Sequence, residues 1–161
     1  MSSAWRWFAL SAAIVLADQL TKWAVLANFT HGERREIAAF LNLVLVYNKG
    51  AAFSMFADAR GWQTPLLVAF ALVAAAIVSY LILRNPAKRL LCFGLALILG
   101  GAVGNLIDRL RFGHVVDFLD FHAMGWHWPA FNVADSGITV GALLLILDGF
   151  AHNEKRARAP S

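Results

Sequence analysis

The 161-residue chain has few of the features that mark a soluble, metal-binding or disulfide-stabilised protein. Its single cysteine, Cys92, can form neither an intramolecular disulfide nor a cysteine-based metal site. Charged residues make up 15% of the chain, whereas about 25% is usual for soluble domains. The sequence has no HExxH motif and no persuasive Ser-His-Asp set. These absences exclude disulfide redox chemistry and argue against an ordinary soluble hydrolase.

Apolar residues are abundant instead: they form 60% of the chain and fall in long runs. Four runs, at about 7–27, 64–83, 90–107 and 131–150, are long enough to cross a bilayer. We expect each to be a helix, because a helix is the only open-chain element that satisfies its own backbone in lipid. A cleaved signal peptide is the alternative for the first run, but that run continues past Lys22 without a clear A-x-A cleavage site.

The charges predict how these spans are oriented. The N-terminal stub, the 84–89 connection and the tail at 152–161 hold seven Lys or Arg residues and one acid, Glu154. The other two connections, 28–62 and 108–130, hold six basic and six acidic residues. By the positive-inside rule both termini are cytoplasmic and the two longer connections face outward. We attribute the net charge of +4 to this topology and not to binding of nucleic acid.

The outward connections have strand-like patterns. Apolar side chains alternate along 41–47, which leads into a turn at Asn48–Gly50, and 113–121 is similar. In an extended 113–121 segment, Asp117 and Asp120 face opposite ways. The predicted fold is an all-α membrane protein, one integral domain of four transmembrane helices with a small extracytoplasmic β-rich cradle and loop.

Polar residues inside the spans are informative, because an ionisable side chain in hydrocarbon costs several kcal/mol unless it is paired or lines a wet cavity. Asp18 and Lys22 are one helical turn apart and can neutralise each other, either as a packed ion pair or as part of a site. At the outer end of the third span, Asn105, Asp108 and Arg109 share one helix face. A helix cap with a surface ion pair is the alternative there, but it does not explain an amide one turn inside the apolar run.

The fourth span begins with a polar stripe that contains Asn132 and Asp135. Asp135 is either an N-terminal helix cap or a functional acid whose partner is Asp117. Two carboxyl groups held close together share a proton, so one can act as a base toward water while the other donates to a carbonyl. The pair therefore suits peptide hydrolysis by aspartic-protease chemistry.

Other titratable groups offer weaker candidates. His122 and His127, with Asp117 or Asp120, offer a set of zinc ligands, but their spacing is nondescript and histidines are common at membrane interfaces, so we expect no metal. Asp148, near the inner end of the fourth span, is expected to be structural.

The sequence resembles the lipoprotein signal peptidase family, also called signal peptidase II, which comprises bacterial intramembrane aspartic peptidases. The resemblance runs from Asp18 to Thr139 in five blocks. They are DQLTK at 18–22, NKGAAF at 48–53, GNLIDR at 104–109, VVDF at 115–118 and FNVAD at 131–135. Each block alone is weak, but five in order on four spans make a specific match.

This resemblance implies that Asp117 and Asp135 are the catalytic dyad. It also implies an outer cleft of substrate-binding or site-supporting residues: Asn48, Gly50, Asn105, Asp108, Arg109, Asn132, Asp18 and Lys22. The implied substrate is a prolipoprotein signal peptide, cut before a cysteine that carries a diacylglyceryl group. The implied enzyme is a monomer of the bacterial inner membrane, in contact with membrane lipid. It has its active site at the outer face, needs no cofactor and is inhibited by the cyclic peptide globomycin.

Two other functions are consistent with a small polytopic protein. A proton- or ion-coupled transporter would use Asp18, Asp135 and Asp148 as relay sites through the membrane depth. The acids cluster at the outer edge instead, and the halves show no repeat. A structural scaffold leaves the amides and acids within the spans without a role.

Overall fold

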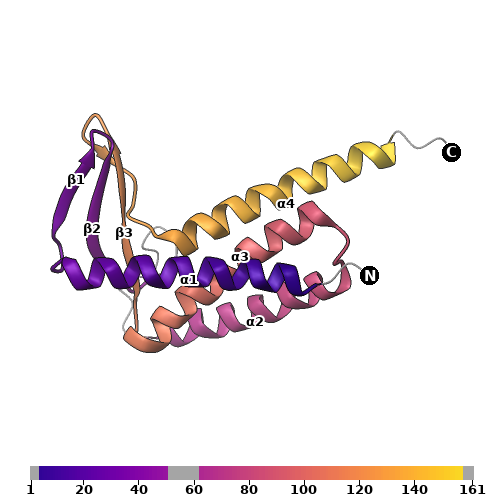
Figure 1. Ribbon diagram of the computed structural model, residues 1–161, viewed down its shortest axis with the longest axis horizontal. Coiled ribbons are helices and arrows are strands. Elements are labelled where there is room, and N and C mark those ends of the chain that lie inside the picture. The colour runs from indigo at the N-terminus through magenta and orange to yellow at the C-terminus, as the bar shows by residue number, and fades with distance from the viewer. Residues whose placement is uncertain (1–3, 51–61, 158–161) are drawn as a thin grey trace.

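A computed structural model describes residues 4–50 and 62–157, with side chains described as far as residue 150. Four long helices lie side by side, and a small sheet stands at one end of them (Figure 1). The elements in chain order are α1 (Trp5–Asn28), β1 (Arg34–Ala38), β2 (Leu41–Asn48), α2 (Gln63–Arg84), α3 (Arg89–Phe112), β3 (Val115–Ala123), β4 (Trp126–His127) and α4 (Val133–Ala157).

Helix α3 is the centre of the helical part and contacts α1, α2 and α4. Each of the four helices is long and apolar enough to cross a membrane, and α3 is the one most buried by its neighbours. Small residues bring α3 and α4 together, since a Cβ atom on Gly141 would lie 2.6 Å from the carbonyl oxygen of Gly94. Such close backbone approach is the usual basis of helix association in lipid, where no hydrophobic effect drives helices together.

The sheet is antiparallel, with the strand order β1-β2-β3-β4. The central pair is set in register by partners such as Tyr47 with Val116 and Asn48 with Val115. A buried cluster of Val25, Leu45, Val116 and Phe118 joins this pair to the end of α1. The sheet is thereby fixed to the helical part next to the first residues of α4.

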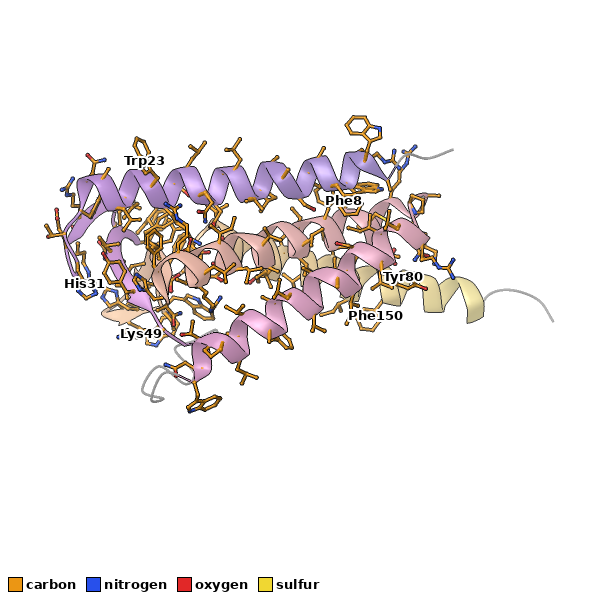
Figure 2. The ribbon with its side chains drawn as sticks, turned by 90° about the horizontal axis from the view of Figure 1, so that it is seen from below. Phe8, Trp23, His31, Lys49, Tyr80 and Phe150 are labelled. Atoms are coloured by element: carbon orange, nitrogen blue, oxygen red, sulfur yellow. The ribbon has the colours of Figure 1, made fainter. Side chains whose placement is uncertain are left out.

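The start of α1 and the end of α4 lie at the end of the molecule opposite the sheet (Figure 1). Figure 2 shows the same polarity in side chains: His31 and Lys49 lie at the sheet end, and Tyr80 and Phe150 lie at the other. The four predicted helices and the small sheet are confirmed.

Two of the helices have bounds that differ from those of the predicted spans. Helix α3 continues beyond residue 107 to Phe112 and ends at Gly113, which adopts the left-handed conformation with φ 75°. Asp108 and Arg109 therefore lie within the helix, on its face at the outer end of the third span, as their spacing from Asn105 predicted. Helix α4 begins at Val133 instead of 131 and includes the backbone of the predicted tail as far as Ala157. Hydropathy reports which residues suit lipid, whereas Asp108 stays inside α3 because Lys22 and the N–H of Val116 pair with its carboxyl group.

Candidate active site

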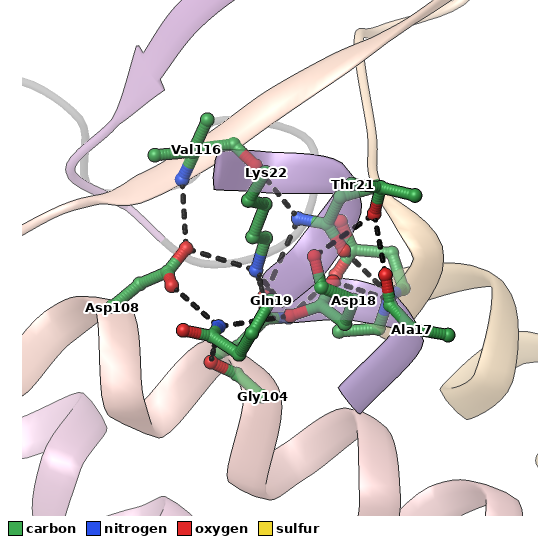
Figure 3. Close-up of polar contacts among 12 residues, drawn as sticks. Ala17, Asp18, Gln19, Thr21, Lys22, Gly104, Asp108 and Val116 are labelled. Carbon is green, nitrogen blue, oxygen red and sulfur yellow. Dashed lines mark hydrogen bonds and ion pairs between the residues drawn. The ribbon is translucent and has the colours of Figure 1, made fainter. Parts of the chain in front are cut away.

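A buried ion triad lies where α1 meets α3. The Nζ atom of Lys22 lies 2.8 Å from Oδ2 of Asp18 and 2.8 Å from Oδ2 of Asp108, and all three side chains are at most 3% exposed (Figure 3). The sequence predicted the first pair from its four-residue spacing. It did not predict the third member, because the meeting of Lys22 with Asp108 depends on how α1 and α3 are rotated toward each other.

The two acids of this triad also hold the elements that carry the candidate dyad. Oδ1 of Asp18 accepts a hydrogen bond from the backbone N–H of Ala134 at 2.9 Å, at the free N-terminal end of α4. Oδ2 of Asp108 accepts one from the N–H of Val116 at 3.0 Å, at the start of β3. The triad therefore fixes the starts of both α4 and β3.

Gln19 completes this arrangement, although sequence reasoning did not single it out. Its Nε2 atom donates to Oδ1 of Asp108 at 2.9 Å and to the carbonyl oxygen of Gly104 at 3.2 Å. The available signal was its place in the DQLTK block, directly after Asp18.

Asp117 lies on β3 and is 2% exposed. Two amides donate to its carboxyl group: Nδ2 of Asn132 to Oδ1 at 2.7 Å, and Nδ2 of Asn48 to Oδ2 at 3.1 Å. Burial, followed by the nearby charge of Asp135, raises the pKa of Asp117 to about 7, against the hydrogen bonds that lower it. Asp117 is therefore poised to exchange a proton near neutral pH.

Asp135 lies in the first turn of α4, but it is not the cap of that helix. Asn132 is the cap, because its Oδ1 accepts the backbone N–H of Asp135 at 2.9 Å. The carboxyl group of Asp135 instead accepts a hydrogen bond from Nδ2 of Asn105 at 2.7 Å. The alternative prediction that Asp135 merely caps the helix is wrong.

Asn105 links the triad to the dyad. Its Oδ1 accepts hydrogen bonds from Nζ of Lys22 at 3.0 Å and from Nδ2 of Asn132 at 3.3 Å. With its oxygen occupied in this way, its amide nitrogen faces Asp135. This explains the amide one turn inside the apolar run of the third span.

The turn after β2 is tied to the same site. Nη2 of Arg109 donates to the carbonyl oxygen of Gly50 at 2.9 Å, and the N–H of Gly50 donates to Oδ1 of Asn48 at 2.9 Å. Because Oδ1 of Asn48 is engaged, its Nδ2 is oriented to donate to Asp117. The remaining residues of the NKGAAF block, 51–53, lie outside the described residues.

A cleft of about 660 Å³ opens beside these groups. Asp135 contributes a carboxyl group to its wall, and Asn48, Asn105 and Arg109 contribute amide and guanidinium groups. Asp117 is not among the described lining residues, but it is hydrogen-bonded to one of them, Asn48. Most of the other lining is apolar and comes from Leu67, Phe70, Ala71, Ala74, Ala102, Val115, Trp128, Pro129, Ala130, Phe131, Ile138 and Val140.

Asp120 has a different set of partners from Asp117, as expected for opposite faces of a strand. Burial alone would raise its pKa, but hydrogen bonds from Asn42 and His127, with the charges of His127 and Arg34, outweigh burial and lower it. Among the described residues, no group of three or more His, Cys, Asp or Glu side chains is arranged to hold a metal ion.

Comparison with known proteins gives concordant matches. Residues 10–151 match the family model described as signal peptidase (SPase) II. Lipoprotein signal peptidases of Paraburkholderia phytofirmans and Ralstonia nicotianae are 56% and 57% identical over 142 residues, which cover 88% of this chain and 83% and 82% of theirs. A solved bacterial membrane enzyme, 26% identical, superimposes with a TM-score of 0.85 over 97% of this chain and 94% of its own. A second, 28% identical, gives 0.80 over 89% and 91%.

Proposed function

The chain belongs to the signal peptidase II family of bacterial membrane proteins, and we propose that it removes signal peptides from diacylglyceryl-modified prolipoproteins by aspartic-protease chemistry. One observation carries the mechanistic part of this proposal. Asp117, with a pKa of about 7, and Asp135 are held by three asparagines next to a cleft that Asp135 lines and whose wall is otherwise mostly apolar.

In the proposed mechanism the two carboxyl groups hold one proton between them at working pH. The ionised member takes a proton from a water molecule, whose oxygen attacks the scissile carbonyl carbon. The protonated member donates to the carbonyl oxygen. The tetrahedral species collapses when a proton is returned to the amide nitrogen and the C–N bond breaks. Asn105, Asn132 and Asn48 hold the two carboxyl groups in place throughout.

The shape of the cleft supports this substrate class. Its apolar lining from α2, α3 and α4 suits the hydrophobic part of a signal peptide or the acyl chains of a lipid-modified cysteine. Its polar side chains are gathered next to the sheet, which we place at the outer surface of the membrane from the charge distribution of the loops. There the scissile bond, directly before the lipid-modified cysteine, meets water while both apolar parts stay in the bilayer.

The contacts of Asp18 favour this proposal over a transporter. A relay acid must gain and lose protons, whereas Asp18 pairs with Lys22 at 2.8 Å and accepts the N–H of Ala134. Asp18, the first acid of the relay that a transporter would need, therefore joins α1 to the start of α4.

The test is cleavage of a diacylglyceryl-modified prolipoprotein by the purified protein in lipid, with and without globomycin. We expect release of an intact signal peptide, a product that begins at the modified cysteine, and inhibition by globomycin. Mass spectrometry identifies both products. The enzyme assignment fails if the substrate stays uncut, and the proposed cut position fails if the product begins elsewhere.

A further inference from the structure

Asp120 joins all four strands of the sheet through one carboxyl group. Its oxygens accept from Nδ2 of Asn42 on β2 at 2.9 Å and contact Nδ1 of His127 on β4 at 2.8 and 3.0 Å. Nε of Arg34, on β1, lies 3.5 Å away. Asp120 itself is on β3 and is 4% exposed. With two hydrogen-bond partners, a guanidinium nearby and a lowered pKa, the buried carboxyl group of Asp120 is held as a carboxylate.

Strand β4 has only two residues, so its position depends on side-chain contacts such as that of His127 with Asp120, here called the tie. It pairs with β3 through His127 with His122 and Trp126 with Ala123. The connecting turn places Met124, which is not glycine, at φ 50°, a conformation that L-residues rarely adopt. A hairpin this short is marginal without further contacts. The contact of His127 with Asp120, and the stacking of its ring on His122 at 5.0 Å, supply them.

The residues that follow β4 form one wall of the catalytic cleft. This segment, 128–131, is here called the cleft wall, and all four of its residues line the cleft. Its first N–H, that of Trp128, donates to the carbonyl oxygen of Phe121 at 2.8 Å, and its last residue, Phe131, pairs with Leu119. The next residue is Asn132, which donates to Asp117. The wall is thus continuous with β4 at one end, where Trp128 also bonds to β3, and is held to β3 at the other end through Phe131 and Leu119.

We propose that Asp120 and His127 are positioning residues for substrate binding: they hold β4 and thereby keep the cleft wall against the apolar part of the substrate. The inference rests on the proposed peptidase function. Neither residue contacts Asp117 or Asp135 in the described hydrogen-bond network, and the dyad has separate anchors in the ion triad and the asparagines. Loss of the tie therefore weakens binding and leaves the chemical step intact.

The test compares His127→Leu with His127→Asn, which keeps an N–H donor near the position of Nδ1. With diacylglyceryl-modified prolipoprotein as substrate, we expect His127→Leu to raise KM about tenfold with kcat within about twofold. His127→Asn should stay within about threefold of the parent KM. His31→Leu is the matched control, because His31 is exposed and stacks on Tyr47 away from β4. Asp120→Asn provides a second variant and should also raise KM more than it lowers kcat.

A spectroscopic measurement tests the same tie without relying on activity. Trp126 and Trp128 form an edge-to-face pair with ring centroids 5.7 Å apart, so their coupled circular-dichroism signal reports the position of the wall. Trp126→Phe identifies that signal. His127→Leu should weaken it and His127→Asn should keep it.

Unchanged KM and an unchanged tryptophan signal in His127→Leu would overturn the proposal, as would a fall in kcat at constant KM. If the parent itself does not cleave the substrate, the proposed function fails. The circular-dichroism comparison then still shows whether Asp120 and His127 hold the wall.

Discussion

Asp117 is a carboxyl group that the fold makes costly to ionise. It is almost fully buried next to a second acid, and its amide donors only partly compensate. Aspartic-protease chemistry requires a group of this kind, because a base whose pKa lies near the working pH exchanges protons most effectively. Burying the ionised carboxylate lowers the free energy of unfolding, and this loss can be measured.

The cost predicts how the stability of the protein depends on pH. Since the pKa of Asp117 rises from 3.8 to about 7 on folding, the native state keeps a proton that the unfolded state releases between these values. The protein therefore loses stability as pH rises through this window, by at most about 4 kcal/mol. Asp117→Asn removes the titrating group, so its Tm relative to the parent should increase between about pH 5 and about pH 8.

Thermal unfolding in detergent, followed across that pH range, checks this directly. Asp148→Asn is the matched control, since Asp148 is a partly exposed acid of α4 far along the helix from the dyad. A Tm difference between Asp117→Asn and the parent that does not change with pH would contradict the raised pKa.

At the scale of elements, α3 shapes the site through a glycine, which leaves room for a side chain of the neighbouring helix α1. Gly104 leaves the space that Asp18 occupies, and a Cβ atom there would lie 2.6 Å from Oδ2 of Asp18. Asp18 in turn holds Lys22 and the first turn of α4. Because Gly104 has no Cβ atom, Asp18 can reach the first turn of α4, and this contact positions Asp135.

Gly104→Ala adds only one methyl group, but we expect it to lower both the stability and the activity of the protein. We expect a loss of about 1–3 kcal/mol of stability from overpacking, together with loss of most of the cleavage activity as α4 shifts. Gly149→Ala is the control, because nothing lies within 4 Å of a Cβ atom there, and alanine is the better helix former by about 1 kcal/mol. Denaturation and cleavage assays that show equal behaviour in the two variants would contradict the role given to Gly104.

At the scale of the whole molecule, the fold separates a polar end from an apolar remainder. The sheet stands at one end of the helices, and the first residues of α1 and the last of α4 lie at the other (Figure 1). Asp117 and Asp135, with the asparagines bonded to them, lie where the sheet meets the start of α4. From the distribution of Lys and Arg, the positive-inside rule predicts that the sheet end faces away from the cytoplasm.

This orientation predicts which positions a membrane-impermeant thiol reagent reaches. His31→Cys, at the sheet end, should be labelled in intact spheroplasts, and Ala87→Cys, in the connection between α2 and α3, only after lysis. The native Cys92 is buried and serves as the unlabelled background. The reverse pattern would show that the sheet faces the cytoplasm.

Much of the architecture was predictable because lipid imposes simple rules on sequence. Long apolar runs predicted four helices, and alternation predicted β2 and β3. Strand β1 was not predicted, since four of its five residues are exposed and carry no alternating pattern. Helix α3 also extends past the end of its apolar run, because Asp108 is paired with Lys22 and with the N–H of Val116 inside the helix.

Several members of the candidate site could be named from the sequence, but the contacts between them could not. Asp117, Asp135 and Asn105 stand out as polar interruptions or as parts of short motifs, and the structure brings them into one hydrogen-bonded network. The link from Lys22 to Asn105 and the hold of Asp18 on α4 depend on helix rotation, which a sequence does not report. The contact between Asp120 and His127 was missed for a different reason: it depends on the pairing of β3 with β4, a strand of two residues that is too short to show an alternating pattern.

The central claim is that Asp117 and Asp135 together carry out peptide-bond cleavage. The most direct measurement is the single-turnover rate of cleavage of diacylglyceryl-modified prolipoprotein by Asp117→Asn, Asp135→Asn and Asp148→Asn, with each variant shown to be folded in the membrane. We predict that the first two rates fall by at least about a thousandfold, as expected for loss of a group that acts on the reacting atoms, and that Asp148→Asn cleaves like the parent. Cleavage by either dyad variant at a rate near that of the parent would contradict the claim.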